Sequence, residues 1–299
     1  MKFKRINIYK PLYNFFSYIN YMIAAFIACT TPYPISYFIG KSLAFLWWLA
    51  HKNVNIVKKN VSCVLNLNIY DKKVIKTSKK IYFEFAKNIV DFLKNGIIPK
   101  RQFIKNIKLD GVENLKNALK EGKGVVIFTA HIGNFEWGAS RIGAEGFKIW
   151  GVGLSRENKF LDNYFEKNRK CKFLNTLNAN KMLGVFRILK NNEIVAIPTD
   201  WDPFGNAKTY TFFGRKATLP SGAIQIALSS GAPLIPSFII RDGQYHHYQI
   251  IGKPLDLIRE GNKEELIEKN MQKVIEVLEK YIYNNIDQWF MFHDIWIDN

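Results

Sequence analysis

A histidine and a glutamate, His131 and Glu136, lie five residues apart in the stretch Thr129-Ala130-His131-Ile132-Gly133-Asn134-Phe135-Glu136. The apolar run Val125 to Phe128 just before them predicts a buried strand, and Gly133-Asn134 predicts a turn that opens a helix. At this spacing the carboxylate can reach back to one ring nitrogen, fix the tautomer and make the other nitrogen a stronger base. Because the motif holds no Ser or Cys nucleophile, the pair is suited to deprotonating an incoming hydroxyl. A core histidine beside a helix-capping glutamate has the same pattern, so the motif alone does not distinguish a catalytic pair from a structural one.

The elements that must position this pair alternate along the chain from about residue 107. Short apolar runs predict strands at Gly124–Phe128, Lys148–Leu154, Ile194–Pro198, Leu234–Ile240 and Tyr248–Ile251. Helical patterns fall between or after them, at Phe135–Ile142, Phe160–Lys170, Lys181–Lys190, Gly222–Ser229 and an amphipathic stretch from Asn262 to Tyr281. This alternation predicts an α/β fold with a mainly parallel central sheet flanked by helices.

Composition narrows the class of partner. The chain has 299 residues, a net charge of +18, 48% hydrophobic and 15% aromatic residues, so its preferred partners should be anionic. Nucleic acid, an acidic membrane surface and an acidic carrier protein all qualify. The stretch Lys72 to Lys80, with five lysines, is either a solvated helix face or a landing surface for such a partner. The three cysteines are scattered, which predicts free thiols and no metal site.

The first 52 residues are expected to form a hydrophobic, helical membrane anchor, followed by one catalytic domain over residues 53–299. Two apolar stretches, Pro11 to Cys29 and Ile35 to Ala50, carry many aromatics and have basic flanks at Lys2 to Lys10 and His51 to Lys59. The Trp47-Trp48 pair beside a basic stretch suits a lipid headgroup layer. The alternative is a buried helical hairpin. Whether the first stretch spans the bilayer or lies on it stays open, because polar residues interrupt it.

Several ordered blocks resemble the bacterial lipid A biosynthesis acyltransferases (lauroyl and myristoyl transferases), within the lysophospholipid acyltransferase superfamily. After an apolar front, the blocks are Lys58-Lys59-Asn60-Val61, Ala130 to Glu136, Leu154-Ser155-Arg156 with Leu161-Asp162 and Arg169, Ile197 to Asp202, Phe212 to Ala217, and Gly231 to Pro236. A lone His-x4-Glu is a weak signal, whereas these blocks cover nearly the whole chain in order.

The resemblance implies a glycerolipid acyltransferase-like fold and a membrane-bound O-acyltransferase. It would move a fatty acyl chain from an acyl thioester, on acyl carrier protein or coenzyme A, to a hydroxyl of a glycolipid, most simply a lipid A precursor, with no other cofactor. His131 would take the hydroxyl proton and Glu136 would hold and polarise the ring, without an acyl-enzyme. The implied location is the cytoplasmic face of a bacterial inner membrane. A phosphatidylinositol mannoside acyltransferase is a related alternative, because that enzyme belongs to the same group.

The resemblance also indicates substrate-binding residues. Arg169 fits a required arginine that would bind a phosphate or neutralise developing charge, and Arg156 is the next candidate. Asp200 follows a predicted strand and would orient the acceptor, although a turn-capping aspartate has the same pattern. Asn134 and Arg215 complete the expected substrate-binding set. For each arginine a surface ion pair or a solvated loop is the alternative.

The chain departs from the family near its C-terminus. The family block there holds Trp, then His followed by two arginines, but in this chain His293 is followed by Asp294 and Ile295. The acceptor is therefore expected to carry less phosphate or to be another glycolipid. A basic, non-enzymatic membrane or nucleic-acid-binding protein remains the rival from another class, although no basic stripe with interleaved aromatics supports nucleic acid. The sequence does not indicate the oligomeric state.

Overall fold

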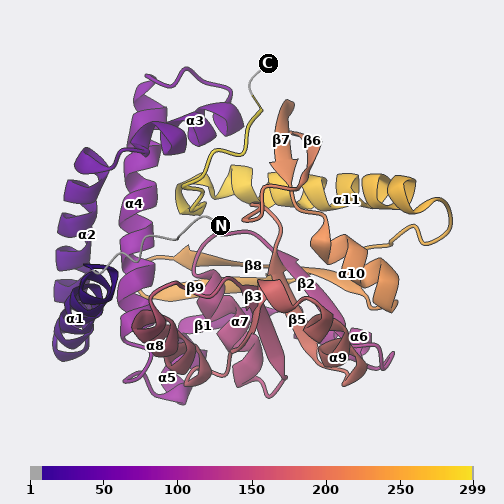
Figure 1. The fold of residues 1–299 in the computed structure, drawn as a ribbon, viewed down its shortest axis with the longest axis horizontal. Helices are drawn as coiled ribbons and strands as arrows, with labels where there is room; N and C mark the ends of the chain where they lie inside the picture. Colours follow the sequence, from indigo (N-terminus) through magenta and orange to yellow (C-terminus); the bar gives the residue numbers. More distant parts are fainter. Residues whose placement is uncertain (1–8, 298–299) are drawn as a thin grey trace, which may run out of the picture.

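A computed structural model describes residues 9–297 and contains a seven-stranded sheet in the order β1-β9-β8-β2-β5-β3-β4 (Figure 1). Its strands are β1 (Ile107–Asp110), β2 (Val125–Thr129), β3 (Ile149–Gly153), β4 (Asn175–Asn178), β5 (Ile194–Pro198), β8 (Leu234–Asp242) and β9 (His246–Ile251). All neighbouring pairs are parallel except β8 with β9. The predicted α/β architecture with a mainly parallel sheet is therefore confirmed.

Helices cover both faces of this sheet, which is why the central strands β2 and β5 are continuous apolar runs over Val125 to Phe128 and Ile194 to Ile197. In β2, Val126 and Phe128 pack into the main core with helices α9 (Leu183–Lys190), α10 (Gly222–Ser230) and α11 (Lys263–Asn284). The alternate residues Val125 and Ile127 pack on the other face, against α6 (Val112–Leu119) and α7 (Phe135–Ala144). The chain also forms α5 (Lys100–Asn106), α8 (Lys159–Lys170) and two 3₁₀ turns, η1 (Ala179–Lys181) and η2 (Ile286–Gln288).

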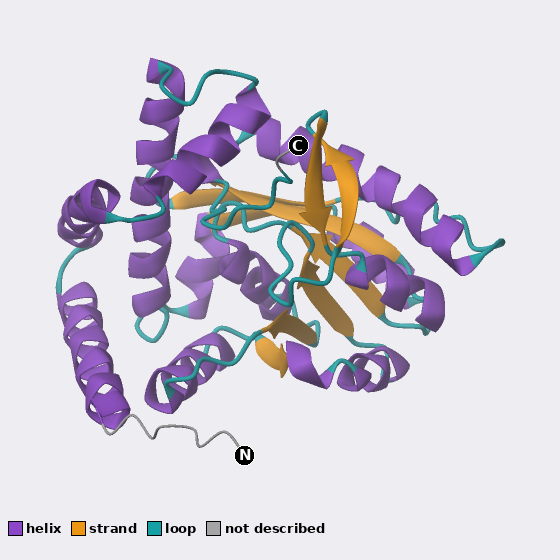
Figure 2. Cartoon of the chain, turned by 45° about the horizontal axis from the view of Figure 1, so that its top comes forward, coloured by secondary structure: helices purple, strands orange, loops and turns teal. Residues whose placement is uncertain are grey.

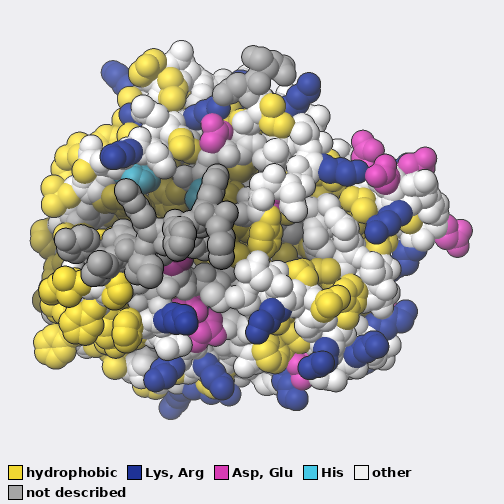
Figure 3. Space-filling model, in the orientation of Figure 1, with side chains coloured by type: hydrophobic (Ala, Val, Ile, Leu, Met, Phe, Trp, Pro, Cys, Tyr) yellow, Lys and Arg dark blue, Asp and Glu magenta, His cyan; other side chains and the backbone are white. Residues whose placement is uncertain are grey.

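Four helices precede the sheet: α1 (Tyr9–Thr30), α2 (Tyr33–Ala50), α3 (Val54–Leu65) and α4 (Lys72–Leu93). Helix α2 packs along α4, whereas most large apolar side chains of α1 are uncovered, including Phe16 and Phe26 at 56% and 68% exposure. Among the described helices, Pro11–Thr30 alone has the length and apolar composition to cross a membrane. Figure 3 shows hydrophobic side chains gathered at the left of the molecule, where α1 and α2 lie. The basic flank predicted at Lys2 to Lys10 lies outside the side chains that the structure describes.

All five predicted strands are present to within two residues at either end, and the predicted helices match α7, α8, α9, α10 and α11. Two of the unpredicted strands, β1 and β4, are four-residue strands at the two edges of the sheet. Their sequences, IKLD and NTLN, lack the apolar run of a central strand. The others, β6 (Lys208–Phe212) and β7 (Arg215–Leu219), form a separate hairpin that stands away from the main sheet (Figure 2).

Candidate active site

The site is built where two neighbouring strands end. Strands β2 and β5 are parallel and adjacent, and their register pairs Thr129 with Pro198. His131 and Asp200 each lie two residues beyond these partners, so the register brings an imidazole and a carboxylate side by side at the carboxyl edge of the sheet. This edge is where open α/β sheets bind ligands.

Asp200 is the carboxylate that holds the His131 ring. Its Oδ1 lies 2.8 Å from His131 Nδ1, and its Oδ2 accepts the backbone N–H of His131 at 2.8 Å and the Trp289 indole N–H at 2.9 Å. Asp200 is fully buried, while the His131 side chain keeps 25% of its surface exposed. An ionised carboxylate only accepts hydrogen bonds, so Nδ1 carries the proton and Nε2 keeps a free lone pair.

Both pKa values follow from this arrangement. Burial alone would lower the pKa of the His131 imidazole, but the charge and hydrogen bond of Asp200 outweigh it, with a smaller contribution from Glu136, and raise the pKa above its usual value. Burial alone would raise the pKa of Asp200, but the charge of His131, the two hydrogen bonds from His131 and that from Trp289 hold it below its usual value. The pair is therefore a carboxylate beside a histidine of increased basicity.

The loop that carries His131 is fixed on several sides. Gly133 has φ +56°, and a Cβ there would lie 1.8 Å from the Ile239 carbonyl oxygen, so only glycine fits. Its carbonyl accepts from Asn88 Nδ2 at 2.7 Å, and the His131 carbonyl accepts from the Phe290 amide, also at 2.7 Å. The imidazole is thus placed by backbone constraints as well as by Asp200.

Glu136 does not hold the imidazole, which corrects the role expected from the sequence. Helix α7 begins at Phe135, and Glu136 in its first turn pairs with Arg169 of α8. Arg169 donates from Nε and Nη2 to the two Glu136 oxygens at 2.9 Å and 2.7 Å, a bidentate pair. Burial would lower the pKa of Arg169, but the hydrogen bond and charge of Glu136 raise it overall. Glu136 reaches His131 only through its charge.

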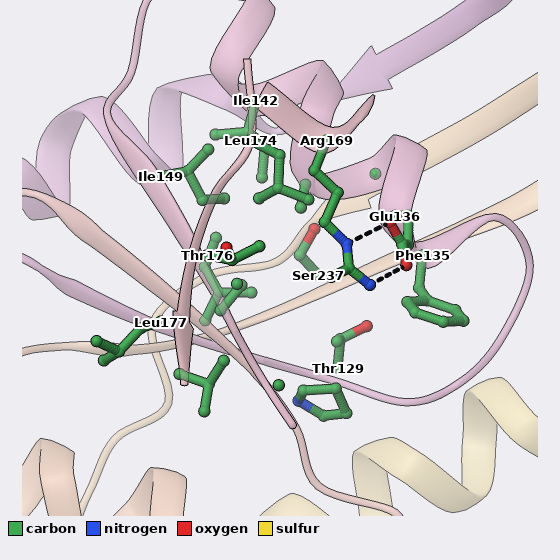
Figure 4. A pocket seen from close by; sticks show the side chains of 18 of the residues that line it. Thr129, Phe135, Glu136, Ile142, Ile149, Arg169, Leu174, Thr176, Leu177 and Ser237 are labelled. Atoms are coloured by element: carbon green, nitrogen blue, oxygen red, sulfur yellow. Dashed lines mark hydrogen bonds and ion pairs between the residues drawn. The ribbon is translucent and has the colours of Figure 1, made fainter. Parts of the chain in front are cut away.

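The Glu136–Arg169 pair lies at one side of a largely apolar cavity, here called the inner cavity. In Figure 4, Ile142, Ile149 and Leu174 cluster away from the charged pair, which lies next to Phe135. The cavity extends between the sheet and helices α7 and α8, and it holds about 830 Å³ of empty space when its open mouth is included. Its apolar lining residues, among them Ile142, Ile149 and Leu174, suit a hydrocarbon chain.

A second apolar depression, here called the outer groove, lies on the other side of the strand ends. His131 lines it directly, together with Trp201, Met182 and Ile197. The inner cavity and the outer groove share four lining residues, Val152, Gly153, Leu154 and Pro198. Phe135, which lines the inner cavity, packs edge-on against the His131 ring at 5.1 Å between centroids. His131 is therefore placed where two apolar spaces meet.

Two of the expected substrate-binding residues have other tasks in the structure. Asn134 is 3% exposed, caps α7 by accepting the Trp137 amide at 3.3 Å, and donates to Asp91 Oδ2 at 3.1 Å. Its polar atoms are thus used within the fold. Arg215 begins β7 at the turn of the β6–β7 hairpin, bonds Asn66 Oδ1 at 3.3 Å, and lines neither apolar space. Neither residue is placed to contact a substrate at His131.

The C-terminal tail supplies residues that the sequence did not indicate as functional. Trp289 holds Asp200, and the His293 ring stacks on Trp201 at 4.0 Å with an interplanar angle of 8°. The Trp201 ring in turn packs edge-on against the His131 ring, with 6.2 Å between the ring centroids. The aromatic residues of this block are visible in the sequence, but the contact of Trp289 with Asp200 depends on the segment after α11 pairing with the His131 loop, through the antiparallel bridge of Trp289 with Ile132. Within residues 9–297, no group of three His, Cys, Asp or Glu side chains is arranged to hold a metal ion.

The profile of the family described as "Bacterial lipid A biosynthesis acyltransferase" matches residues 4–297. The chain belongs to this family. It is 23% identical over 269 residues to the lipid A biosynthesis lauroyltransferase of Escherichia coli K12, covering 88% of this chain and 85% of that protein. Among solved structures it is similar to the 1-acyl-sn-glycerophosphate acyltransferase of Thermotoga maritima, at 18% identity and a TM-score of 0.37, over 81% of this chain and 97% of that one. Family membership makes this chain an O-acyltransferase and sets aside the non-enzymatic alternative.

Proposed function

We propose that this chain transfers a fatty acyl chain from an acyl thioester, carried by acyl carrier protein, to a hydroxyl group of a lipid A precursor. The observation that carries the proposal is His131, held by Asp200 with Nε2 free, at the junction of two apolar spaces. The lauroyltransferase named above supports the acceptor class, and the net charge of +18 supports an acidic carrier as donor.

The geometry of the site supports the following reaction. The acyl chain of the donor lies in the inner cavity, and the hydrocarbon part of the acceptor lies in the outer groove, with its hydroxyl at His131. Nε2 takes the hydroxyl proton as the oxygen attacks the thioester carbonyl, and Asp200 stabilises the imidazolium that forms. The tetrahedral intermediate then collapses, the carbon–sulfur bond breaks, and the departing thiolate takes the proton from His131. No covalent acyl-enzyme is needed.

The N-terminal helices support a position at the bilayer. Helix α1 exposes a row of apolar side chains, and α2 exposes Phe38 and Leu46 at 73% and 60%. We propose that these helices hold the enzyme on the cytoplasmic face of a bacterial inner membrane, where its lipid acceptor is found.

The test is an acyl-transfer assay in detergent with labelled acyl carrier protein and either purified lipid A precursor or phosphatidylinositol mannoside, with products resolved by mass spectrometry. His131→Ala should lower the rate about 10²- to 10⁴-fold, the usual contribution of a positioned general base. His246→Ala is the matched control, because His246 is exposed on β9 and lines neither apolar space. Equal rates in wild type and His131→Ala would refute the mechanism. Transfer to phosphatidylinositol mannoside but not to the lipid A precursor would show that the mannoside is the acceptor.

A further inference from the structure

Arg156 lies in the segment between β3 and α8, at the entrance of the inner cavity. Its neighbours Leu154 and Ser155 line that cavity, and its own amide donates to Asp162 Oδ1 at 2.9 Å. Asn158 fastens the same segment to α1 by donating from Nδ2 to the Asn14 carbonyl at 2.8 Å. The segment that carries Arg156 is therefore fixed to the N-terminal helix, and the guanidinium lies close enough to Arg169 and Glu136, which line the cavity, for their charges to act on it.

The Arg156 guanidinium is stacked but not paired. Its Cζ lies 3.5 Å from the Phe165 ring centroid, and the Cζ of Arg169 lies 5.8 Å from the same ring. Arg169 is neutralised by its two bonds to Glu136, and no carboxylate among residues 9–297 lies within 4.0 Å of the Arg156 guanidinium. Burial and the charge of Arg169 both lower the pKa of Arg156, yet an arginine stays protonated at neutral pH.

This arrangement leaves two guanidinium groups near one ring, and among residues 9–297 only that of Arg169 has a carboxylate paired with it. A cation that is largely removed from water is costly unless an anion pairs with it. The planar fork of arginine matches phosphate oxygens in a bidentate manner, and its stacking on Phe165 fixes the plane of the fork. Arg169 cannot serve a phosphate in the same way, since Nε and Nη2 of its fork are already bonded to Glu136.

We propose that Arg156 binds a phosphate group of a substrate at the mouth of the inner cavity, and that the phosphate role expected for Arg169 belongs to Arg156. The proposal rests on the proposed function and makes its substrate chemistry more specific. Two phosphates can reach this place: the phosphodiester of a phosphopantetheine thioester donor, and a phosphate on the glycolipid acceptor. The same fork can pair with either of them, so the source is a question for experiment.

The experiment combines two variants with substrates that have or lack phosphate. Arg156→Gln removes the cation, and Arg187→Gln makes the same change at an exposed position on α9 that lines neither apolar space. The donors are an acyl-phosphopantetheine and an acyl-N-acetylcysteamine thioester, which has no phosphate. The acceptors are a phosphorylated glycolipid and its dephosphorylated form. Binding of inorganic phosphate to the full chain in uncharged detergent, followed by ³¹P NMR, is measured separately and needs no turnover.

Arg156→Gln should raise KM about 10- to 100-fold for the substrate whose phosphate it binds, the scale of a lost charged hydrogen bond. The effect should vanish when that substrate lacks phosphate, which identifies donor or acceptor, and Arg187→Gln should leave KM unchanged. Phosphate binding should weaken in Arg156→Gln even if wild type transfers nothing, in which case the proposed function fails alone. The site is refuted if KM rises equally with and without phosphate and phosphate binding is unchanged, because Arg156 then only supports the contact of α8 with α1.

Discussion

The substitution Asp200→Asn tests which carboxylate controls His131. Oδ2 of Asp200 accepts two N–H donors, from the His131 backbone and from Trp289, so the amide oxygen of the replacement must occupy that position. The amide NH₂ then faces His131 Nδ1, which has to accept a hydrogen bond and gives up its proton to Nε2. The ring is left in the tautomer that cannot act as a base toward the acceptor.

The expected loss is large. In a serine protease triad the same exchange costs about 10⁴-fold in kcat, and a positioned general base contributes about 10²–10⁴-fold, or about 2.7–5.5 kcal/mol of activation free energy. We expect kcat/KM to fall within that range, measured as initial rates of acyl transfer in detergent. The fold should persist, because the replacement has the same shape and keeps two of its three hydrogen bonds.

The pH profile gives the sharper test. Activity requires unprotonated His131, so kcat/KM falls as the pH drops through the His131 pKa, which Asp200 holds above 6.5. Without the charge of Asp200, burial lowers that pKa, and the acidic limb should move to lower pH. Glu136→Gln should move the limb in the same direction by less, since Glu136 acts only through its charge. A limb that moves in Glu136→Gln and not in Asp200→Asn would show that Glu136 controls the ring and refute this reasoning.

A smaller perturbation of the same carboxylate is Trp289→Phe, which removes one donor to Asp200 and keeps the aromatic ring. The pKa of Asp200 then rises, its hold on the His131 proton strengthens, and the acidic limb should move to higher pH. Trp296→Phe is the control. Trp296 lies on the same C-terminal tail, but its indole N–H donates to Asn60 Oδ1 at 2.8 Å and not to Asp200. The coupling of Trp289 to the dyad is refuted if both variants give the same limb.

Two further substitutions test the inner cavity and the helix cap, and a third tests the loop. A Cβ at Gly151 would meet Leu174 at 3.6 Å, an ordinary contact, so Gly151→Leu should shorten the inner cavity. With a mixture of acyl donors of different chain length, the variant should favour shorter acyl chains. An unchanged distribution of acyl lengths in the product would show that the acyl chain does not bind in the inner cavity. Asn134→Ala should lower the free energy of unfolding by about 1–3 kcal/mol in urea, while kcat of the folded enzyme stays close to wild type; a large fall in kcat would restore a substrate role. Gly133→Ala should not yield folded protein, and a soluble active variant, checked by circular dichroism and rate, would contradict the loop geometry.

The central part of the fold could be predicted from the sequence because its signals are local. The runs at Val125 and Ile194 predict buried strands by composition alone, and the alternation of strands and helices predicts a parallel sheet. The edge strands β1 and β4 could not be predicted in this way, because a four-residue strand beside a single neighbour needs no apolar run. Their pairing is fixed only when the rest of the sheet exists.

The sequence predicts which residues form the site better than it predicts which of them contact one another. The sequence indicates His131, Glu136, Arg169 and Asp200, yet it places Glu136 on the ring, because Glu136 is the nearest carboxylate along the chain. The structure assigns Asp200, which is distant in sequence but adjacent through the register of β2 with β5. Which strands are neighbours is a property of topology, and a single sequence does not state it. The same holds for Trp289, which reaches Asp200 from the far end of the chain.

The C-terminal departure from the family pattern acquires a physical meaning in the structure. Asp294 pairs with Lys59 at 2.9 Å and accepts the Trp296 amide at 3.1 Å, while Ile295 is 2% exposed in the main core. Both positions are therefore used to pack the tail against α3, and the tail brings no arginine to the acceptor. A cation for an acceptor phosphate therefore has to come from another element. Among residues 9–297, Arg156, beside α1 and α8, offers a guanidinium with no carboxylate paired with it.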